Sequence, residues 1–211
     1  MTETVLFGAA YSVYVRAARM ALAEKGVPYR LEGVDIFAEG GPPADYLRRH
    51  PFGRIPAFAH GDIALYETVA ILRYVDEGFE GPALQPPEPA ARARMVQIQS
   101  ILDNYAYRSW VWDIHVQRVE RDPPDEARIA QAVPKAARVL DAITDIVAAG
   151  TTEGPFFLGA TPCLADLMAA PMAALLLETP EGRHLFAERP GWTAWWAAVA
   201  ARESFKATAA A

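Results

Sequence analysis

The 211-residue chain has one cysteine, Cys163, which excludes an internal disulfide. This thiol and the four histidines form no recognisable metal-binding cluster, so we expect no metal cofactor. No stretch reaches about 18 uninterrupted apolar residues, and the first residues lack the basic start and apolar run of a secretory signal. We therefore expect a cytoplasmic protein that does not enter a membrane.

Positive charge is also scarce, since 20 Lys and Arg stand against 26 Asp and Glu. The formal net charge is −6 and the pI is near 5.3. Without a cluster of Lys and Arg there is no basic face, so we expect no nucleic-acid partner. An apolar content of 52% is ordinary for a globular protein, and the length allows one large domain or two small ones.

Short strand and helix patterns alternate over residues 1–78. A helix is expected from Val13 to Lys25, where Gly26 and Pro28 end it. The other expected elements are a short helix at 44–49, a helix at 68–76, and strands at 4–10, 29–36, 57–59 and 63–66. The order strand–helix–strand, then strand–strand–helix, predicts a thioredoxin-like α/β domain.

Residues 79–90 are interrupted by glycine and proline and are expected to form a linker. Residues 91–211 are predicted to be an all-helical domain, beginning with one long helix over 90–121. Further helices are expected at 127–149, 164–177 and 192–201. Pro171 lies inside one of them and is predicted to kink or divide it.

The segment from His50 to Phe58, followed by Glu67 and Thr68, suits the binding of a small zwitterionic peptide. Pro56 must lie at the edge or end of a strand, and a cis bond before it would turn the backbone of Ile55 outward. An extended peptide could then pair with that backbone. Glu67 offers a carboxylate for an ammonium, and the following helix start offers N–H groups for a carboxylate. An ordinary loop, edge strand and capped helix would explain the same residues.

Ser12 follows the first expected strand and precedes the first helix. Its hydroxyl could simply cap that helix. A hydroxyl donor at a helix N-terminus could instead stabilise a bound thiolate and lower the pKa of a thiol from about 8.5.

Four motifs together resemble those of soluble glutathione transferases. The resemblance covers nearly the whole chain and lies in SVYVRAAR, PFGRIPAF…GDIALYETVAILRYV, FLG…CLADL and RP…WW…SFKA. The last motif is similar to the ending of bacterial members, so the chain is identified as resembling a bacterial member of this family with a serine at the catalytic position. The resemblance implies a thioredoxin-like domain followed by an all-helical domain.

The resemblance also implies roles for single residues. Glutathione would be the co-substrate and Ser12 the catalytic residue, whereas Tyr11 is one residue out of register and would line the pocket wall. The implied glutathione-binding residues are Arg54, Ile55, Pro56, Glu67 and Thr68. Gly41 and Pro42 depart from the family pattern, because many relatives have His or Lys there to hold the glycine carboxylate.

The long helix is implied to line the pocket for an apolar electrophile. Tyr107 and Trp110 share one face of that helix by the three-residue rule, with core packing of Trp110 or Trp112 as the alternative. Asp103, further up the helix, would reach the peptide across the interface of a homodimer.

The expected activity is glutathione transfer to small apolar electrophiles, as in detoxification. A non-catalytic protein that binds glutathione or apolar ligands is the alternative, and a structural or regulatory protein with the same fold stays open. Cys163 and Asp166 are interpreted as a helix capping box and the cysteine as non-catalytic.

Overall fold

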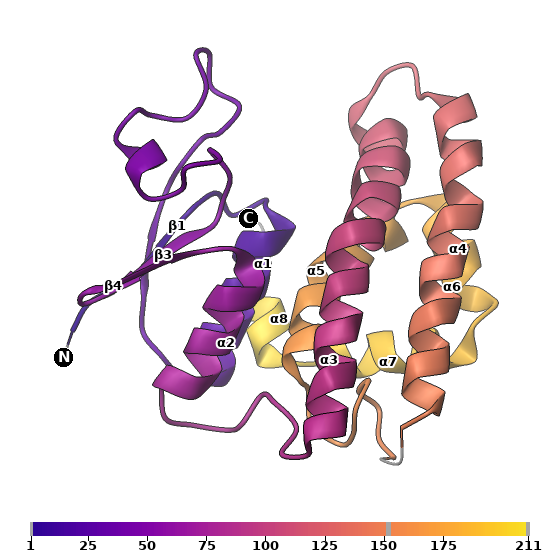
Figure 1. Cartoon of the computed structure of the whole chain (residues 1–211). Helices are drawn as coiled ribbons and strands as arrows, with labels where there is room; N and C mark the ends of the chain where they lie inside the picture. The colour runs from indigo at the N-terminus through magenta and orange to yellow at the C-terminus, as the bar shows by residue number, and fades with distance from the viewer. Residues whose placement is uncertain (1, 151–152, 210–211) are drawn as a thin grey trace. The chain divides into compact units, whose positions relative to one another are not determined.

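A computed structural model describes residues 2–150 and 153–209 of the chain. The protein consists of two compact units (Figure 1). The first comprises the residues up to Ala83 together with the segment from Glu203, and the second comprises Leu84–Arg202.

The first unit is built on a four-stranded sheet with the strand order β2-β1-β3-β4. β1 runs parallel to β2 and antiparallel to β3, and β3 runs antiparallel to β4. The strands are β1 (Thr4–Phe7), β2 (Arg30–Glu32), β3 (Ala57–His60) and β4 (Ile63–Tyr66). β2 is shorter than the expected strand over 29–36 because pairing with β1 ends at Glu32. The thioredoxin-like α/β fold expected from the sequence is confirmed.

Two helices, α1 (Val13–Glu24) and α2 (Thr68–Gly78), pack side by side on one face of the sheet (Figure 1). The apolar side chains of α1 that recur at helical spacing, Val15, Ala18 and Leu22, are fully buried. The loop between β2 and β3 holds one short 3₁₀ turn, η1 (Tyr46–Arg48), where the sequence predicted a short helix.

The chain returns to the first unit through α8 (Glu203–Ala207), which packs on α1. The guanidinium of Arg16 donates to the carbonyl of Phe205 and lies 4.0 Å from the centre of its ring. Ser204 donates to the carboxylate of Glu24. The sequence placed this segment with the helical domain 91–211, because a five-residue helix gives no periodicity from which its packing partner could be inferred.

The second unit is all-helical, as expected. α3 continues directly into η2, which is wound with π-type (i→i+5) hydrogen bonds and packs along α4 and α5. Pro171 does not divide α5, and α6 was not predicted. The elements are α3 (Pro89–Ile101), η2 (Leu102–Glu120), α4 (Glu126–Ala148), α5 (Leu164–Glu178), α6 (Pro180–Ala187) and α7 (Pro190–Ala200).

The N-terminus of α5 is organised by Asp166, whose side chain is fully buried. Its carboxylate accepts hydrogen bonds from the backbone N–H of Cys163 (2.7 Å) and Phe157 (3.0 Å) and from the indole N–H of Trp195 (2.7 Å). Burial raises the pKa of the Asp166 carboxyl, and these hydrogen bonds oppose the rise. Burial also raises the pKa of the Cys163 thiol, which disfavours the reactive thiolate. The expected capping box is confirmed.

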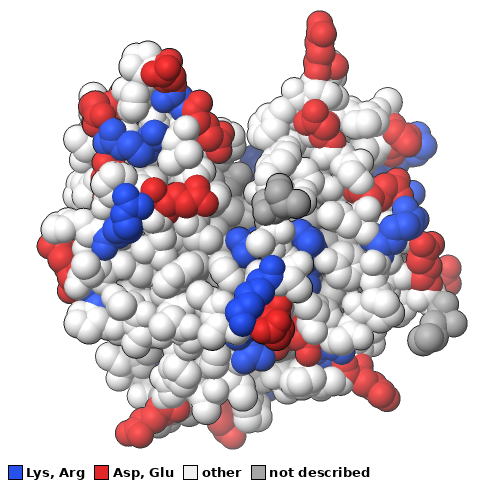
Figure 2. Space-filling model, turned by 180° about the vertical axis from the view of Figure 1, so that it is seen from behind, with Lys and Arg blue, Asp and Glu red and all other residues white. Residues whose placement is uncertain are grey.

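Acidic and basic side chains are interspersed over the face drawn in Figure 2. Within residues 2–150 and 153–209, no helix is both long and apolar enough to cross a membrane. The same part of the chain contains no group of three or more His, Cys, Asp or Glu residues that could hold a metal ion.

Candidate functional site

The strand register brings the candidate residues of the first unit to one end of the sheet. Phe7 at the end of β1 pairs with Ala57 at the start of β3, and Ala57 pairs with Tyr66 at the end of β4. The chain that leaves β1, the chain that enters β3 and the chain that leaves β4 therefore meet there. These three segments carry Ser12, Ile55-Pro56 and Glu67-Thr68, which are far apart in the sequence.

A tight turn fixes the chain that enters β3. The N–H of Gly53 donates to the carbonyl of His50 at 2.9 Å, and the φ angle of Gly53 is +61°, which favours glycine. The residue after Gly53 is also fixed, because the hydroxyl of Tyr46 donates to the carbonyl of Arg54 at 2.6 Å. These contacts lead the backbone into Ile55 in a defined geometry.

The bond between Ile55 and Pro56 is cis, and both side chains are buried. Within the part of the chain that the structure describes, neither the N–H nor the C=O of Ile55 makes a hydrogen bond. This backbone is therefore available to pair with an extended peptide, which is the arrangement that the sequence suggested for a cis bond.

Glu67 has an unusual backbone conformation at the start of α2. Its φ and ψ angles are 70° and 116°, and it is the one non-glycine residue with positive φ in the described ranges. Such a conformation costs on the order of 1–3 kcal/mol and is found preferentially at ligand-binding and active sites. The carboxylate of Glu67 is exposed.

The first turn of α2 follows Glu67 directly. Thr68, its first residue, is buried, and no side chain of the preceding residue caps the helix. The N–H groups of this turn are therefore suited to a carboxylate ligand, because a helix N-terminus combines free donors with a favourable dipole.

Ser12 caps α1, as one of the two sequence interpretations required. Its Oγ accepts the N–H of Val15 at 3.4 Å, a long hydrogen bond that leaves the hydroxyl proton free to be donated elsewhere. Gly8 allows the turn between β1 and α1 to approach Ile55. A Cβ atom at Gly8 would lie 2.4 Å from Val15 Cγ2 and 3.3 Å from Ile55 Cβ. The close approach brings the N-terminus of α1 toward the backbone of Ile55.

Two exposed aromatic side chains lie beside Ser12 in the first unit. Tyr11 and Phe37 stack with their ring centroids 6.3 Å apart. The pair presents an apolar surface that suits an apolar ligand. Tyr11 was expected in a pocket wall, whereas sequence reasoning missed Phe37, because its loop has no periodicity that would distinguish one aromatic residue.

Gly41 and Pro42 are uncharged and stand where the resemblance implied a His or Lys for the glycine carboxylate. Pro42 lies against the tight turn, since a Cβ atom at Gly53 would be 3.0 Å from Pro42 Cγ. Arg54, which is exposed, is the cation beside Ile55 in the sequence. His50, at the start of the segment expected to bind the peptide, is 2% exposed. Burial lowers the pKa of its imidazole, the charge of Glu67 opposes this shift, and Arg54 adds a smaller lowering.

The candidates on η2 belong to the second unit and differ in their surroundings. Trp110 is fully buried and packs edge-on against Trp192 with a centroid distance of 5.9 Å. The structure therefore favours core packing over a pocket wall for Trp110. Tyr107 is half-buried and contacts the ring of Trp112, and Asp103 is exposed in the first turn of η2.

Two family models match the chain. The glutathione S-transferase N-terminal domain matches residues 6–83, and the glutathione S-transferase C-terminal domain matches residues 126–198. The chain is 30% identical to glutathione S-transferase 3 of Zea mays, with all of this chain and 95% of the maize protein covered. It is 29% identical to a probable glutathione S-transferase of Oryza sativa, with 100% and 97% covered.

Solved structures give the same result. Poplar glutathione transferase F1 superimposes with a TM-score of 0.83 at 28% identity, covering 99% of this chain and 97% of the poplar protein. A variant of that poplar protein in which a serine is replaced by cysteine matches equally well, with a TM-score of 0.83 at 27% identity over 99% of this chain and 97% of that chain. These relatives are plant proteins, so they do not support the expectation of a bacterial member. Together, the fold and the matches over its full length show that the chain belongs to the glutathione S-transferase family.

Proposed function

We propose that this protein transfers glutathione to small apolar electrophiles and that the N-terminal end of α1 activates the glutathione thiol. The observation that carries the proposal is the meeting of three segments at one end of the sheet, one of which holds Glu67 in a strained conformation. A binding site explains why such a conformation is retained.

The peptide fits these segments by its charges. The γ-glutamyl ammonium pairs with the exposed Glu67 carboxylate, and the adjoining carboxylate accepts hydrogen bonds from Thr68 and the first turn of α2. The central part of glutathione pairs with the backbone of Ile55. Arg54 supplies the positive charge for the glycine carboxylate, since Gly41 and Pro42 have none.

Ser12 donates its hydroxyl proton to the glutathione sulfur in this arrangement. That hydrogen bond and the dipole of α1 both favour the thiolate, which is the nucleophilic form. The sulfur then forms a bond to the electrophilic carbon, and the electron pair that is displaced leaves with a leaving group or moves onto the electrophile. The exposed rings of Tyr11 and Phe37 provide an apolar surface for this second substrate.

The Ser12→Ala variant tests the proposal, with Tyr11→Phe as the matched control for the neighbouring hydroxyl. We expect Ser12→Ala to keep glutathione affinity but to lower kcat/KM by a factor that corresponds to about 3 kcal/mol. The ultraviolet absorbance of the bound thiolate should titrate at a higher pH. Equal rates and equal titrations in parent and variant would place the activation at Tyr11 or on backbone N–H groups.

Glutathione binding without turnover of aryl halides, epoxides, enones or peroxides would instead favour the alternative of a non-catalytic binding protein. Detoxification and a cytoplasmic location stay expectations from the sequence. So does the contribution of Tyr107 to the electrophile pocket.

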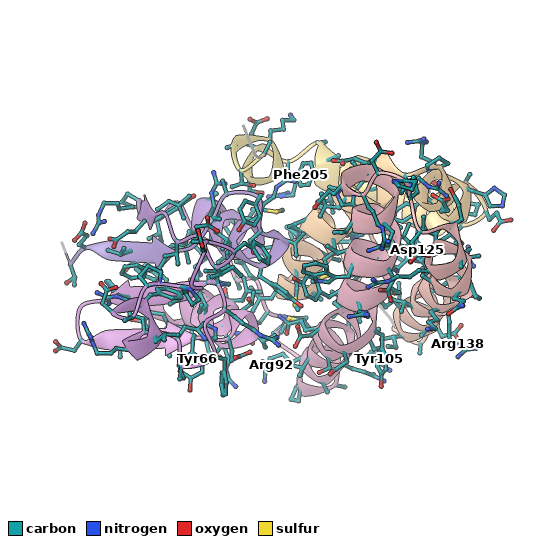
Figure 3. The ribbon with its side chains drawn as sticks, turned by 90° about the horizontal axis from the view of Figure 1, so that it is seen from above. Tyr66, Arg92, Tyr105, Asp125, Arg138 and Phe205 are labelled. Atoms are coloured by element: carbon teal, nitrogen blue, oxygen red, sulfur yellow. The ribbon has the colours of Figure 1, made fainter. Side chains whose placement is uncertain are left out.

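We also infer that the protein is a homodimer. Exposed aromatic side chains of the kind enriched at interfaces occur in both units, with Phe52 70% exposed and Tyr105 63% exposed. Tyr66 on β4 and Tyr105 on η2 project outward from their elements (Figure 3). Asp103 is exposed in the first turn of η2, and we propose that it contacts the glutathione bound by the partner subunit.

A further inference from the structure

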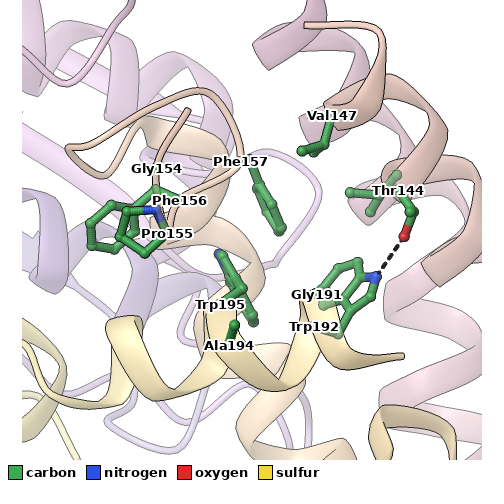
Figure 4. Close-up of a pocket in the computed structure, with 11 residues that line it drawn as sticks. Thr144, Val147, Gly154, Pro155, Phe156, Phe157, Gly191, Trp192, Ala194 and Trp195 are labelled. Atoms are coloured by element: carbon green, nitrogen blue, oxygen red, sulfur yellow. Dashed lines mark hydrogen bonds between the residues drawn. The ribbon is translucent and has the colours of Figure 1, made fainter. Parts of the chain in front are cut away.

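The second unit contains a cavity that the proposed reaction does not use. It has a volume of about 220 Å³ and lies between the C-terminal half of α4, the loop 154–157 and the first half of α7 (Figure 4). Every residue around it belongs to Leu84–Arg202, whereas Ser12 and Glu67 belong to the other unit. The cavity is therefore a separate feature of the protein.

Buried aromatic rings form the inner wall of this cavity. Phe157 and Trp195 stack with a centroid distance of 4.8 Å and an interplanar angle of 3°. Trp192 contacts both rings edge-on, at 5.4 Å from Phe157 and 5.2 Å from Trp195. These mutual contacts fix the rings, so the wall is formed before any ligand arrives.

Hydrogen bonds hold the two indole rings in place. The N–H of Trp192 donates to the carbonyl of Leu140 and to the hydroxyl of Thr144, both at 3.1 Å, and Figure 4 shows the bond to Thr144. The N–H of Trp195 donates to the carboxylate of Asp166 at 2.7 Å. Because both donors are already used within the protein, the rings offer their carbon surfaces to the cavity.

The remaining walls are uncharged, with Ile143 and Val147 supplying aliphatic surface from α4. The rim is open to solvent, since Pro155, Gly191 and Ala194 are exposed although the rings behind them are buried. An apolar cavity of about 150 Å³ is large enough to bind benzene, and pockets for drug-sized molecules begin at about 300 Å³. The present cavity lies between these two sizes.

We infer that this cavity is a binding site for an uncharged aromatic molecule of one or two fused rings. A charged ligand would lose its hydration without gaining a partner, because no side chain of the lining carries a charge. A flat ring system buries its faces against Phe157 and Trp192 and leaves any hydroxyl at the exposed rim.

Calorimetric titration with 1-naphthol tests the inference, with S-hexylglutathione present at saturation to occupy the proposed glutathione site. We expect saturable binding of one naphthol per chain that persists with S-hexylglutathione. Naphthalene-1-sulfonate, which has the same rings and a negative charge, should not bind there. Equal binding of the sulfonate would overturn the assignment of an uncharged ligand.

Variants that fill the cavity identify the site. Gly191→Leu is suitable because a Cβ atom at Gly191 meets no atom within 4 Å, and Ala194→Leu adds bulk at the rim. Ala197→Leu is the matched control, since Ala197 is exposed on the same helix but does not line the cavity. The two filling variants should weaken naphthol binding by about tenfold or more, a loss of about 1.4 kcal/mol. The control should change it by less than about twofold, as is usual for surface substitutions.

Two results would overturn the inference: equal naphthol affinity in all three variants and the parent, or loss of binding in Ala197→Leu as well. Conjugation rates provide an independent readout, because none of the three positions belongs to the proposed catalytic site and all three variants should keep the parent rate. If the parent conjugates no electrophile, the proposed function fails, while the comparison of naphthol affinities still decides whether the cavity binds.

Discussion

Replacing Asp166 by alanine should destabilise the second unit more than any surface substitution. The carboxylate is fully buried and accepts three hydrogen bonds, from Cys163, Phe157 and Trp195. Each buried donor left without an acceptor costs about 1–3 kcal/mol, and removing the buried charge returns part of this cost. We therefore expect a net loss of about 3–5 kcal/mol in the free energy of unfolding, a large share of the stability of an ordinary domain.

The isosteric variant Asp166→Asn separates charge from shape. The amide of Asn keeps one acceptor oxygen but turns its NH₂ group toward a backbone donor, so one hydrogen bond is lost. The free energy of unfolding should fall by about 1–3 kcal/mol. Asp141→Ala is the control, because Asp141 is exposed and its carboxylate pairs with Arg189 at the surface at 2.8 Å. Such a surface pair contributes at most about 1 kcal/mol.

Urea unfolding followed by tryptophan fluorescence measures these losses by linear extrapolation. All five tryptophans lie in the second unit, so the signal reports the unit that contains Asp166. If Asp166→Ala and Asp141→Ala were equally stable, the carboxylate would not organise this part of the fold, and the stability would have to come from the stacked rings alone.

Three further predictions follow from the proposed site and its neighbours. Glu67→Gln should weaken glutathione binding by about 1.5–3 kcal/mol in calorimetry with a much smaller effect on the rate at saturation; equal affinity would show that the peptide binds in another orientation. Burial lowers the pKa of His50 in the folded protein below the value of about 6.5 that it has in the unfolded chain. The neutral imidazole therefore stabilises the fold fully at pH values above about 6.5, and this stabilisation is lost as the pH falls toward the pKa of the folded state. His50→Gln should therefore reduce the dependence of Tm on pH between about 5 and 7, and an unchanged slope would assign that dependence to other groups. Light scattering at low concentration should give twice the chain mass of 23.0 kDa, whereas a monomer with full activity would exclude both the dimer and the role of Asp103.

Much of the first unit could be predicted from the sequence because its signals are local. Glycine and proline ended the elements where expected, as at Gly26 after α1. Glu67 and Thr68 could be placed at a helix start from their order alone. The positive φ angle of Glu67 could not be predicted, because residues other than glycine rarely adopt it and no local sequence pattern marks it.

Other features depend on contacts between distant segments, which no local pattern encodes. The packing of α8 on α1 joins residues about 190 positions apart through Arg16 and Phe205. Phe37 comes near Tyr11 only because the loop after β2 folds back to the start of α1. In both contacts the partners lie in segments that no shared periodicity connects, so the sequence could not indicate that they meet.

Trp110 shows how a correctly predicted helix can leave two interpretations of one side chain open. Tyr107 and Trp110 share a face if the chain winds with 3.6 residues per turn, and the sequence interpretation assumed this winding. From Leu102 to Glu120, however, the hydrogen bonds are of the π type, which widens the turn and shifts each side chain around the axis relative to an α-helix. Trp110 is buried against Trp192, while Tyr107 is half-buried beside Trp112. Because helical propensity and composition do not distinguish α from π winding, the sequence could not decide between core packing and a pocket wall for Trp110.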